Sequence, residues 1–272
     1  MSESYVHGYD GTEAQRLQDQ AASLVDLLHA DTAYPPGHRV LEAACGVGAQ
    51  TVTLARRSPQ ARITSVDISA PSLVQARAAA RAAGAANVEF LQADVFRLPF
   101  APHAFDHIFV CFLLEHLPRP LEALHALQRV LRPGGSITVI EGDHGSAYFH
   151  PRSPHAQQAI DCLVELQARA GGNALIGRTL HPLLAQAGFG DVRVSPRMVY
   201  VDDSRPHLVE GFTRRTFTAM VRGVRAAAIA AELATPEGFD RGVAGLERTA
   251  AGGGVFCYTF FKAVAAAKGD EG

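Results

Sequence analysis

The residues best placed to do chemistry begin with two glycines that follow a short apolar run. Gly46 and Gly48 lie one residue apart, after the apolar pair Val40-Leu41 and the acid Glu42. Glycine adopts positive φ easily and lets the backbone pass close to a ligand, and a helix that follows offers free N–H groups. Open α/β sheets bind nucleotides at a turn of this kind after the first parallel strand. The pair alone also fits a tight strand–helix turn that binds nothing.

Two further acids follow β-prone runs at a spacing that suits a nucleoside. Asp67 ends the run 63–66, nineteen residues after Gly48, and is placed to accept hydrogen bonds from a ribose diol. Asp94 follows the run 88–91 in the same way. Acids are also common in solvated turns, so each of the two has this simpler interpretation as well.

The elements that must position these residues alternate between β-prone runs and helical segments. The β-prone runs are 40–42, 63–66, 88–91, 105–112 and 136–140, and helical segments separate them. Five strands that alternate with helices over about 110 residues predict a parallel, doubly wound sheet with right-handed crossovers.

The second half of the chain is less regular. Helices are expected at 155–170, near 178–187 and over roughly 205–232, and β-prone runs at 191–201 and 255–264. Two terminal strands joined by a long excursion would complete a seven-stranded sheet.

Composition narrows the class of protein. The 272 residues are 47% hydrophobic and carry a net charge of -2, without the basic stripe that nucleic acids require. The four cysteines are far apart and predict reduced thiols, and the first residues lack the features of a signal peptide. No apolar run approaches the roughly 18 residues of a membrane span. We therefore expect a cytoplasmic protein that acts on a small molecule, of unknown oligomeric state.

Four motifs in order resemble the class I S-adenosylmethionine-dependent methyltransferases, and in particular the small-molecule branch that includes the ubiquinone/menaquinone C-methyltransferases. The motifs are Glu42-x-x-x-Gly46-x-Gly48, Val66-Asp67, Ala93-Asp94 and Leu131-Arg132-Pro133-Gly134-Gly135. The resemblance covers 37–145 and, more loosely, the two C-terminal strands. The loop lacks a third glycine, a departure that this family tolerates and that weakens a dinucleotide fingerprint.

The resemblance implies an α/β fold with a Rossmann-like, doubly wound sheet of seven strands. Their order would be 3-2-1-4-5-7-6, with the last strand antiparallel and with helical cap insertions. It also implies a single domain over 1–272. Its parts would be an N-terminal lid helix at 1–36, a cofactor-binding core at 37–145, substrate-cap insertions at 146–254 around strand six and a last strand at 255–265.

The same resemblance implies S-adenosyl-L-methionine as cofactor, with S-adenosyl-L-homocysteine as product, and gives roles to matching positions. The methionine part would be bordered by Gly46 and Gly48, with Glu42 beneath the loop and the backbone carbonyls of Cys111 and Phe112 facing the ammonium group. The nucleoside would be held by Asp67 at the ribose and by Ile68, Asp94 and Val95 around the adenine.

An N-terminal helix closes over the cofactor in similar enzymes. We expect Tyr9 and Arg16 to help cover it here, with Arg16 pairing with the methionine carboxylate. The alternative is a surface helix whose charges are solvated.

A sulfonium methyl is already activated, so proximity and in-line orientation can supply much of the catalysis of its transfer by SN2 attack. A base is needed only where the acceptor must lose a proton. We expect Glu141 or His144 to contact the acceptor, with Asp143 orienting it, although Glu-Gly-Asp-His-Gly also suits a polar turn. Nearby acids and histidines show no recognisable metal motif, so no metal is expected.

The acceptor is expected near Glu115, His116 and Tyr148, although Glu115-His116 could simply begin the next helix. Two other functions fit the pattern less well. An NAD(P)-dependent oxidoreductase would share the sheet and Asp67, and a cofactor-binding protein that does not methylate would share the whole site. The identity of the acceptor and of its methylated atom is open.

Overall fold

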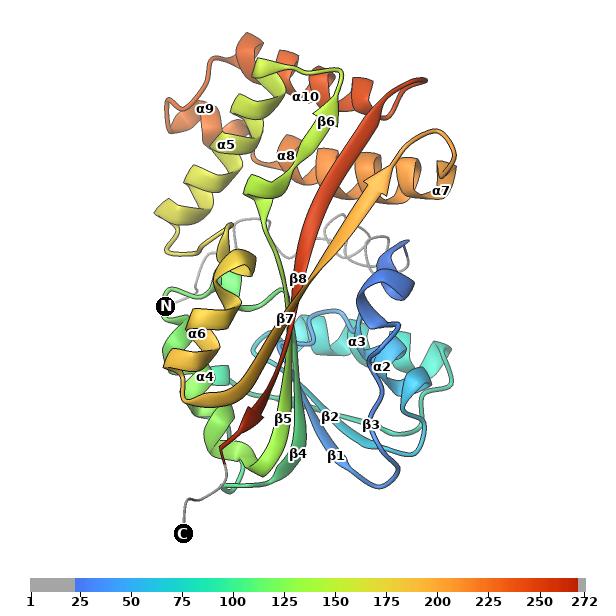
Figure 1. Cartoon of the computed structure of the whole chain (residues 1–272), viewed down its shortest axis with the longest axis vertical. Coiled ribbons are helices and arrows are strands. Elements are labelled where there is room, and N and C mark those ends of the chain that lie inside the picture. Colours follow the sequence, from blue (N-terminus) through green and yellow to red (C-terminus); the bar gives the residue numbers. More distant parts are fainter. Residues whose placement is uncertain (1–22, 269–272) are drawn as a thin grey trace. The chain divides into compact units, whose positions relative to one another are not determined.

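The structure is a computed structural model that describes residues 23–268 (Figure 1). Helical residues 23–29 come first. The strands are β1 (Arg39–Ala43), β2 (Arg62–Asp67), β3 (Val88–Gln92), β4 (Phe105–Cys111), β5 (Leu131–Gly142), β6 (Tyr148–His150), β7 (Phe189–Val201) and β8 (Val255–Ala267). The α-helices are α2 (Thr51–Arg57), α3 (Ala70–Ala82), α4 (Pro120–Val130), α5 (Pro154–Arg169), α6 (Leu180–Gln186), α7 (Pro206–Leu208), α8 (Ala219–Gly223), α9 (Arg225–Ala230) and α10 (Pro236–Thr249).

Short helices of other kinds lie between these elements. Four are 3-10 helices: η1 (Val95–Arg97), η2 (Leu114–His116), η3 (His144–Ser146) and η4 (Ile176–Thr179). One is a π-helix, η5 (Val209–Thr218).

The strands form a sheet in the order β3-β2-β1-β4-β5-β8-β6, with β7 also paired to β8. The neighbours from β3 to β5 are parallel, and β6 is antiparallel to β8. The arrowheads of β7 and β8 point in opposite directions (Figure 1). With β7 as the expected sixth strand and β8 as the expected last one, the predicted order and the antiparallel last strand are confirmed. The short strand β6 is an addition that the sequence did not indicate.

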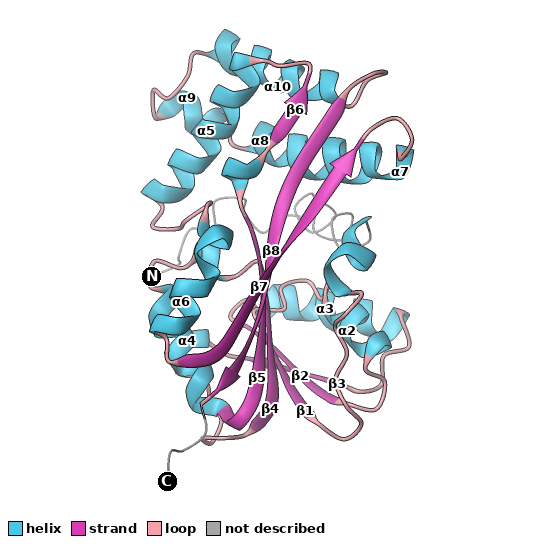
Figure 2. Ribbon diagram, in the orientation of Figure 1, coloured by secondary structure: helices cyan, strands magenta, loops and turns pink. Residues whose placement is uncertain are grey.

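The described chain divides into two compact units. The sheet unit comprises 28–141, 176–197 and 261–268, and the helical unit comprises 23–27, 142–175 and 198–260. The long strands β7 and β8, which stand out in Figure 2, contribute residues to both units.

One side of the sheet in the sheet unit is packed by α4 and α6, and the other by α2 and α3 (Figure 1). The side under α4 and α6 is apolar, with Ile108, Val110, Leu124, Leu127 and Leu184 fully buried in a single cluster. Burying each such side chain contributes about 1.5–3 kcal/mol, so this layer supplies much of the stability of the unit. The other side carries the buried polar groups described below.

The helical unit contains a helix that the sequence did not predict. α10 has glycines that suggest chain breaks, but two of them face α5 at close range. A Cβ on Gly242 would lie 2.5 Å from the carbonyl oxygen of His155, and one on Gly245 would lie 2.6 Å from Ser153 Oγ. These glycines therefore serve close helix packing, which outweighs their low helix propensity of about 1 kcal/mol each.

The motif Leu131–Gly135, whose proline and glycines are typical of a turn, lies within a strand. These residues form the start of β5, where the pairing with β4 shifts register between Phe105 and His107. Gly134 has a φ of 69°, so the turn chemistry is used for an irregularity at the beginning of the strand.

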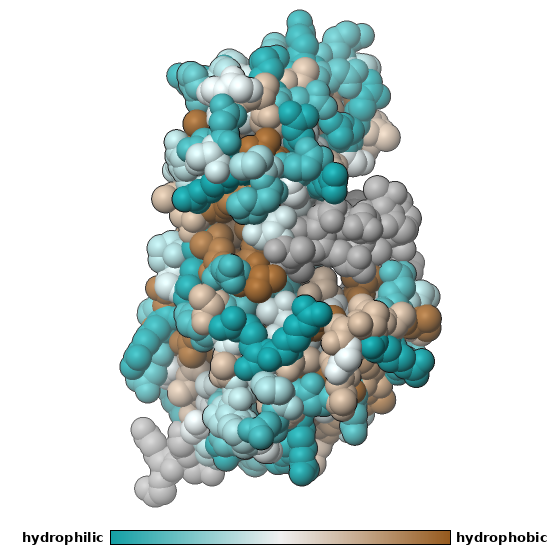
Figure 3. All heavy atoms as spheres, turned by 90° about the vertical axis from the view of Figure 1, so that its right-hand side faces the viewer, coloured by the Kyte–Doolittle hydropathy of each residue, from teal (hydrophilic) through white to brown (hydrophobic). Residues whose placement is uncertain are grey.

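The face drawn in Figure 3 is mostly hydrophilic, with apolar residues in smaller groups. Among residues 23–268, none of the helices combines the length and apolar character that crossing a bilayer requires.

Candidate functional site at the carboxyl ends of the strands

The carboxyl ends of four neighbouring strands lie at one edge of the sheet. Ala43, the last residue of β1, pairs with Val66 of β2 and with Val110 of β4. The strand order reverses direction between β1 and β4, which is the position where open α/β sheets bind ligands. The residues that follow these strands are therefore brought together by the pairing.

The two glycines after β1 have different surroundings. Gly46 has a φ of 54°, and no atom of residues 23–268 lies within 4 Å of the position its Cβ would take. Gly48 has a φ of 81°, and its Cβ would lie 2.9 Å from Cα of Ala76 in α3. Gly48 thus allows α3 to approach the turn, whereas Gly46 leaves open space beside the backbone. Ala44 also has positive φ, 57°, a conformation that the sequence did not indicate.

Asp67 connects the glycine turn to the end of β2. Its Oδ2 accepts the Gly46 N–H at 2.8 Å and its Oδ1 accepts the Ser69 N–H at 2.8 Å. The Ala93 N–H donates to the Asp67 carbonyl oxygen at 3.0 Å, and this hydrogen bond connects the end of β3 to the end of β2. The side chain is buried, and this burial raises its pKa above the ordinary value. Asp67 is therefore a fixed acceptor group rather than a solvated turn residue.

The residues expected around an adenine follow β2 and β3. Ile68 is 57% exposed although it is apolar, and Val95 is half-buried. Asp94 Oδ1 accepts the Phe96 N–H at 2.9 Å and so begins η1. Asp94 thus has a local structural role whether or not it binds a ligand.

Glu42 lies in β1, and one of its carboxyl oxygens accepts two hydrogen bonds. Its Oε2 accepts hydrogen bonds from Thr51 Oγ1 and Ser65 Oγ, both at 2.6 Å. Only 2% of the residue is exposed. Burial raises the pKa of Glu42 to about 7, with the two hydroxyl groups opposing that rise. Near neutral pH this carboxyl is therefore shared between its protonated and ionised forms.

The end of β4 also has unusual geometry. Phe112 has a φ of 54°, and its N–H donates to the carbonyl oxygen of Ile140 at 2.9 Å. Burial raises the pKa of the Cys111 thiol well above its ordinary value, so this thiol is protonated. Positive φ in a bulky residue costs on the order of 1–3 kcal/mol and is typical of functional sites.

The acidic and imidazole side chains expected on the acceptor side are divided between the two units. Glu115 and His116 form η2, are 3.6 Å apart at Oε1 and Nε2, and belong to the sheet unit. Glu141 is fully buried at the end of β5 in the same unit. His144 lies in the helical unit and is buried, with its Nδ1 2.6 Å from the Tyr258 hydroxyl oxygen.

The turn that carries His144 forms side-chain hydrogen bonds to two neighbouring residues of β8. Ser146 Oγ accepts the Thr259 N–H at 3.0 Å, one residue after the Tyr258 contact. A Cβ on Gly142 would lie 2.4 Å from the Tyr258 hydroxyl oxygen, so glycine leaves room for that ring. Tyr258 and Gly142 were not predicted, because only the tertiary structure brings β8 to this turn.

The other residues expected at the site contribute less to its geometry. Asp143 Oδ1 accepts the Gly145 N–H at 3.0 Å and begins η3, which matches the simpler turn interpretation. Tyr148 is 68% exposed in β6. Tyr9 and Arg16 lie outside the described residues. Within 23–268, the structure holds no group of three or more His, Cys, Asp or Glu side chains arranged for a metal ion.

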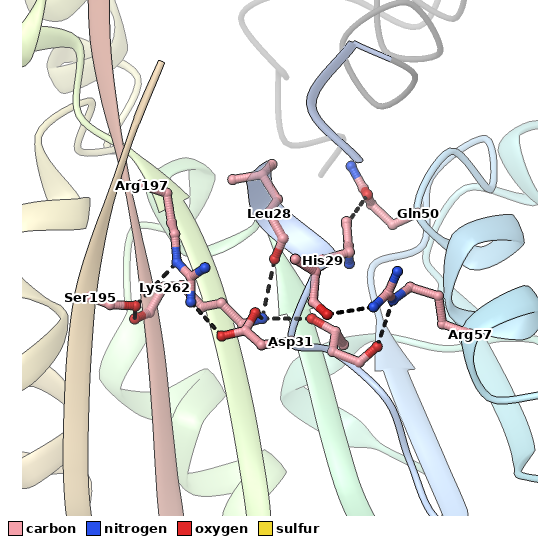
Figure 4. A network of polar contacts seen from close by, with 10 residues as sticks. Leu28, His29, Asp31, Gln50, Arg57, Ser195, Arg197 and Lys262 are labelled. Carbon is pink, nitrogen blue, oxygen red and sulfur yellow. Dashed lines mark hydrogen bonds and ion pairs between the residues drawn. The ribbon is translucent and has the colours of Figure 1, made fainter. Parts of the chain in front are cut away.

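A polar network that the sequence did not predict lies beside β8 (Figure 4). Lys262 Nζ donates to the Leu28 carbonyl oxygen at 3.1 Å, to Asp31 Oδ1 at 2.6 Å and to Thr32 Oγ1 at 2.6 Å. Arg197 binds the other carboxylate oxygen of Asp31. Lys262 is buried inside an otherwise apolar strand, and this isolated charge is the signal that could have revealed it.

His29 joins the same segment to the turn after β1. Its Nε2 lies 2.7 Å from Oε1 of Gln50, the residue before α2, and its ring lies 5.6 Å from that of Phe109 (Figure 4). Burial lowers the pKa of His29 to about 4, so the ring is neutral at physiological pH.

Comparison with known proteins identifies the sheet. Residues 40–135 match a family model described as a methyltransferase domain. The C-methyltransferase UbiE of ubiquinone/menaquinone biosynthesis from Roseobacter denitrificans is 30% identical over 191 residues, which are 68% of this chain and 65% of that protein. The demethylmenaquinone methyltransferase of Thermus thermophilus is 39% identical over 103 residues, 38% of this chain and 46% of that protein. The chain spans about half to two thirds of the length of the curated relatives it matches.

Solved structures agree on the fold. The [4+2]-cyclase SpnF has a TM-score of 0.56 at 21% identity, over 92% of this chain and 81% of that one. Phosphoethanolamine N-methyltransferase 2 of Haemonchus contortus, in complex with phosphomonomethylethanolamine and S-adenosylhomocysteine, has a TM-score of 0.56 at 16% identity, over 93% of this chain and 53% of that one. Residues 40–135 therefore form a methyltransferase domain of the class I S-adenosylmethionine-dependent type, and the solved structures show the same fold for the chain.

Proposed function

We propose that the protein transfers a methyl group from S-adenosyl-L-methionine to a small-molecule acceptor by in-line attack. The observation that carries the proposal is the glycine turn after β1. Gly46 leaves open space beside a left-handed backbone, and its N–H donates to Asp67 at the end of β2. A backbone with this exposure beside a fixed carboxylate suits a nucleoside with a polar extension.

The residues that follow neighbouring strands would contact successive parts of the cofactor, from the nucleoside to the methionine. Asp67 retains carboxylate acceptor capacity for the ribose hydroxyls, because each of its oxygens has two lone pairs and the N–H groups of Gly46 and Ser69 each use only one of them. The exposed Ile68, with Asp94 and Val95, would lie against the adenine, and the backbone carbonyls of Cys111 and Phe112 would accept from the ammonium group.

The methionine end of the cofactor would lie over the glycine turn. Gly46 and Gly48 would border it, Glu42 would lie beneath it, and Tyr9 and Arg16 of the N-terminal segment would cover it. When bound, the cofactor supplies an activated methyl group, and the protein supplies position and exclusion of water. The co-crystallised S-adenosylhomocysteine of the Haemonchus enzyme supports this choice of cofactor.

On the acceptor side, we propose two separate candidate groups for contact with the small molecule, which are Glu115 and His116 in the sheet unit and His144 and Tyr148 in the helical unit. The Tyr258 hydroxyl fixes one ring nitrogen of His144, so the other nitrogen has a defined direction. An acceptor that carries a hydroxyl could lose its proton to this ring. His144→Ala should then lower kcat by about 10²-fold or more, measured as S-adenosylhomocysteine release with hydroxyl-bearing acceptors found by screening.

The first test is calorimetric titration with S-adenosylmethionine and S-adenosylhomocysteine, beside NAD and NADP. We expect binding of the first pair with Kd in the range of about 1–100 μM, weakened at least about tenfold in Asp67→Ala. Asp161→Ala, which removes an exposed acid on α5, is the matched control and should bind like the wild type. Binding of NAD in place of the first pair would refute the proposal.

A second function has one supporting observation, because the fold neighbour SpnF is a [4+2]-cyclase. The same fold therefore occurs in a protein named for a different reaction. Consumption of the cofactor distinguishes the two functions. Binding of S-adenosylmethionine without conversion to S-adenosylhomocysteine, over a broad panel of acceptors, would favour the non-methylating alternative.

A further inference from the structure

The two carboxyl oxygens of Glu141 have opposite surroundings. Oε1 accepts the Leu113 N–H at 3.0 Å and the Leu114 N–H at 2.7 Å. Oε2 is buried and has no hydrogen-bond partner among the described residues. The side chain as a whole has no exposure to solvent.

This arrangement favours a protonated acid over a carboxylate. An ionised carboxylate buried with one oxygen unpaired is far more costly than the neutral acid. The Glu115 carboxyl interacts electrostatically with Glu141, and the Cys111 thiol interacts with Glu141, Glu115, Glu42 and Lys262. Burial therefore raises the pKa of Glu141 well above its ordinary value, and the Glu115 carboxyl adds to the rise.

The groups that Glu141 holds belong to the loop after β4. Phe112 takes its positive φ at the start of this loop, and Glu115 and His116 form its end. The N–H groups of Leu113 and Leu114 precede or begin η2 and have no partner within the helix, so Glu141 supplies the acceptor that they need.

We propose that Glu141 is a positioning residue, a protonated acid that holds the 112–116 loop, in place of the acceptor-contacting base expected from its sequence position. The proposal rests on the proposed function, because it assigns the loop to the cofactor through the Phe112 carbonyl and to the acceptor through Glu115 and His116. The acid–base groups of this side of the site are then Glu115 and His116.

The test compares Glu141→Gln with Glu141→Met by calorimetric melting at pH 5 and pH 8.5 without ligand. The glutamine keeps an oxygen that accepts both N–H groups and carries no titratable proton, whereas methionine offers no comparable acceptor. The unfolded wild type releases its proton above pH 4.5, while the folded form keeps it. The wild type therefore loses stability as pH rises toward the folded pKa.

We expect Glu141→Gln to melt close to the wild type at pH 5 and about 2–5 °C above it at pH 8.5. Glu141→Met should melt about 5–10 °C below the wild type at both values, because two buried donors lose their acceptor. Glu165→Gln on the exposed face of α5 is the control, and its difference from the wild type should not grow with pH. A Glu141→Gln protein that falls below the wild type as pH rises would overturn the proposal.

Titration with S-adenosylhomocysteine separates this proposal from the proposed function. Glu141→Gln should bind within about twofold of the wild type, and Glu141→Met should bind at least about tenfold more weakly. A wild type that fails to bind would refute the function while the melting series still decides the protonation of Glu141. Tight binding by the wild type with equal loss in both variants would refute the positioning role alone.

Discussion

At the scale of single residues, Gly46 and Gly48 have different structural roles although they lie in the same turn. Both glycines have positive φ, but only Gly48 faces another element at close range. Gly46 instead leaves its side open at the edge where the strands end. Spacing within the motif therefore does not tell whether a glycine serves the ligand or the packing.

Substituting each glycine with alanine should separate these roles. Gly48→Ala should lower the free energy of unfolding by about 2–4 kcal/mol, from positive φ plus overlap with Ala76 in α3. Gly46→Ala should lower it by only about 1 kcal/mol but weaken S-adenosylhomocysteine binding at least about tenfold. Urea unfolding and calorimetric titration measure the two effects. A Gly46→Ala protein that binds normally would show that the open space is not the cofactor site.

At the scale of elements, carbonyl groups at the end of helical residues 23–29 and just after it accept hydrogen bonds from cations of distant elements. Arg57 of α2 donates to the carbonyl oxygens of Ala30 and Thr32. Lys262 of β8 binds the Leu28 carbonyl oxygen and Asp31 (Figure 4). Cations at this end complement the helix dipole and satisfy carbonyls that have no partner within the helix.

Removing the buried cation should cost far more than removing an exposed one. Lys262→Met should lower the free energy of unfolding by about 3–5 kcal/mol, because Leu28 and Thr32 lose a buried partner and Asp31 keeps Arg197 as its one remaining counter-ion among the described residues. Arg169→Ala, which breaks an exposed pair with Glu165 on α5, should cost less than about 1 kcal/mol. Urea unfolding at pH 7 measures both. Equal costs would show that the Lys262 network does not stabilise this end of the segment.

At the scale of the whole molecule, two neutral histidines, the buried His29 and the half-buried His107, link folding to pH. Burial lowers the pKa of His29 and of His107 to about 4, from an ordinary value of 6.5. The unfolded chain binds protons at these groups below pH 6.5 and the folded chain does not. Their contribution to stability is therefore present above pH 6.5 and is lost as pH falls toward 4.

The variant His29→Leu isolates one of these contributions. It should be less stable than the wild type at pH 7.5, because the contact with Gln50 is lost. The difference should shrink by up to about 3 kcal/mol as pH falls from 6.5 to 4, since only the wild type loses the His29 contribution. Urea unfolding at pH 7.5, 5.5 and 4.5 follows this change. A difference that stays constant with pH would mean that folded His29 is protonated normally.

The sequence by itself determined the alternation of strands and helices, the glycine turn and the acids after β2 and β3. These features are local, because propensity, apolar periodicity and turn chemistry act over a few residues. Parallel pairing then predicted where these residues meet, because it brings the carboxyl ends of neighbouring strands to one edge of the sheet. The meeting of Gly46, Asp67 and Asp94 at one edge followed from these rules, whereas the strand order was an implication of the family resemblance.

Only the tertiary structure decided what depends on contacts between distant segments. The helix α10 was not predicted, because the close packing of its glycines on α5 is not local. Tyr258 meets His144, and Lys262 meets Asp31, across more than 100 residues of chain. The protonation of Glu141 likewise depends on burial and on the loop after β4. Environment, more than residue type, sets what a buried polar group can do.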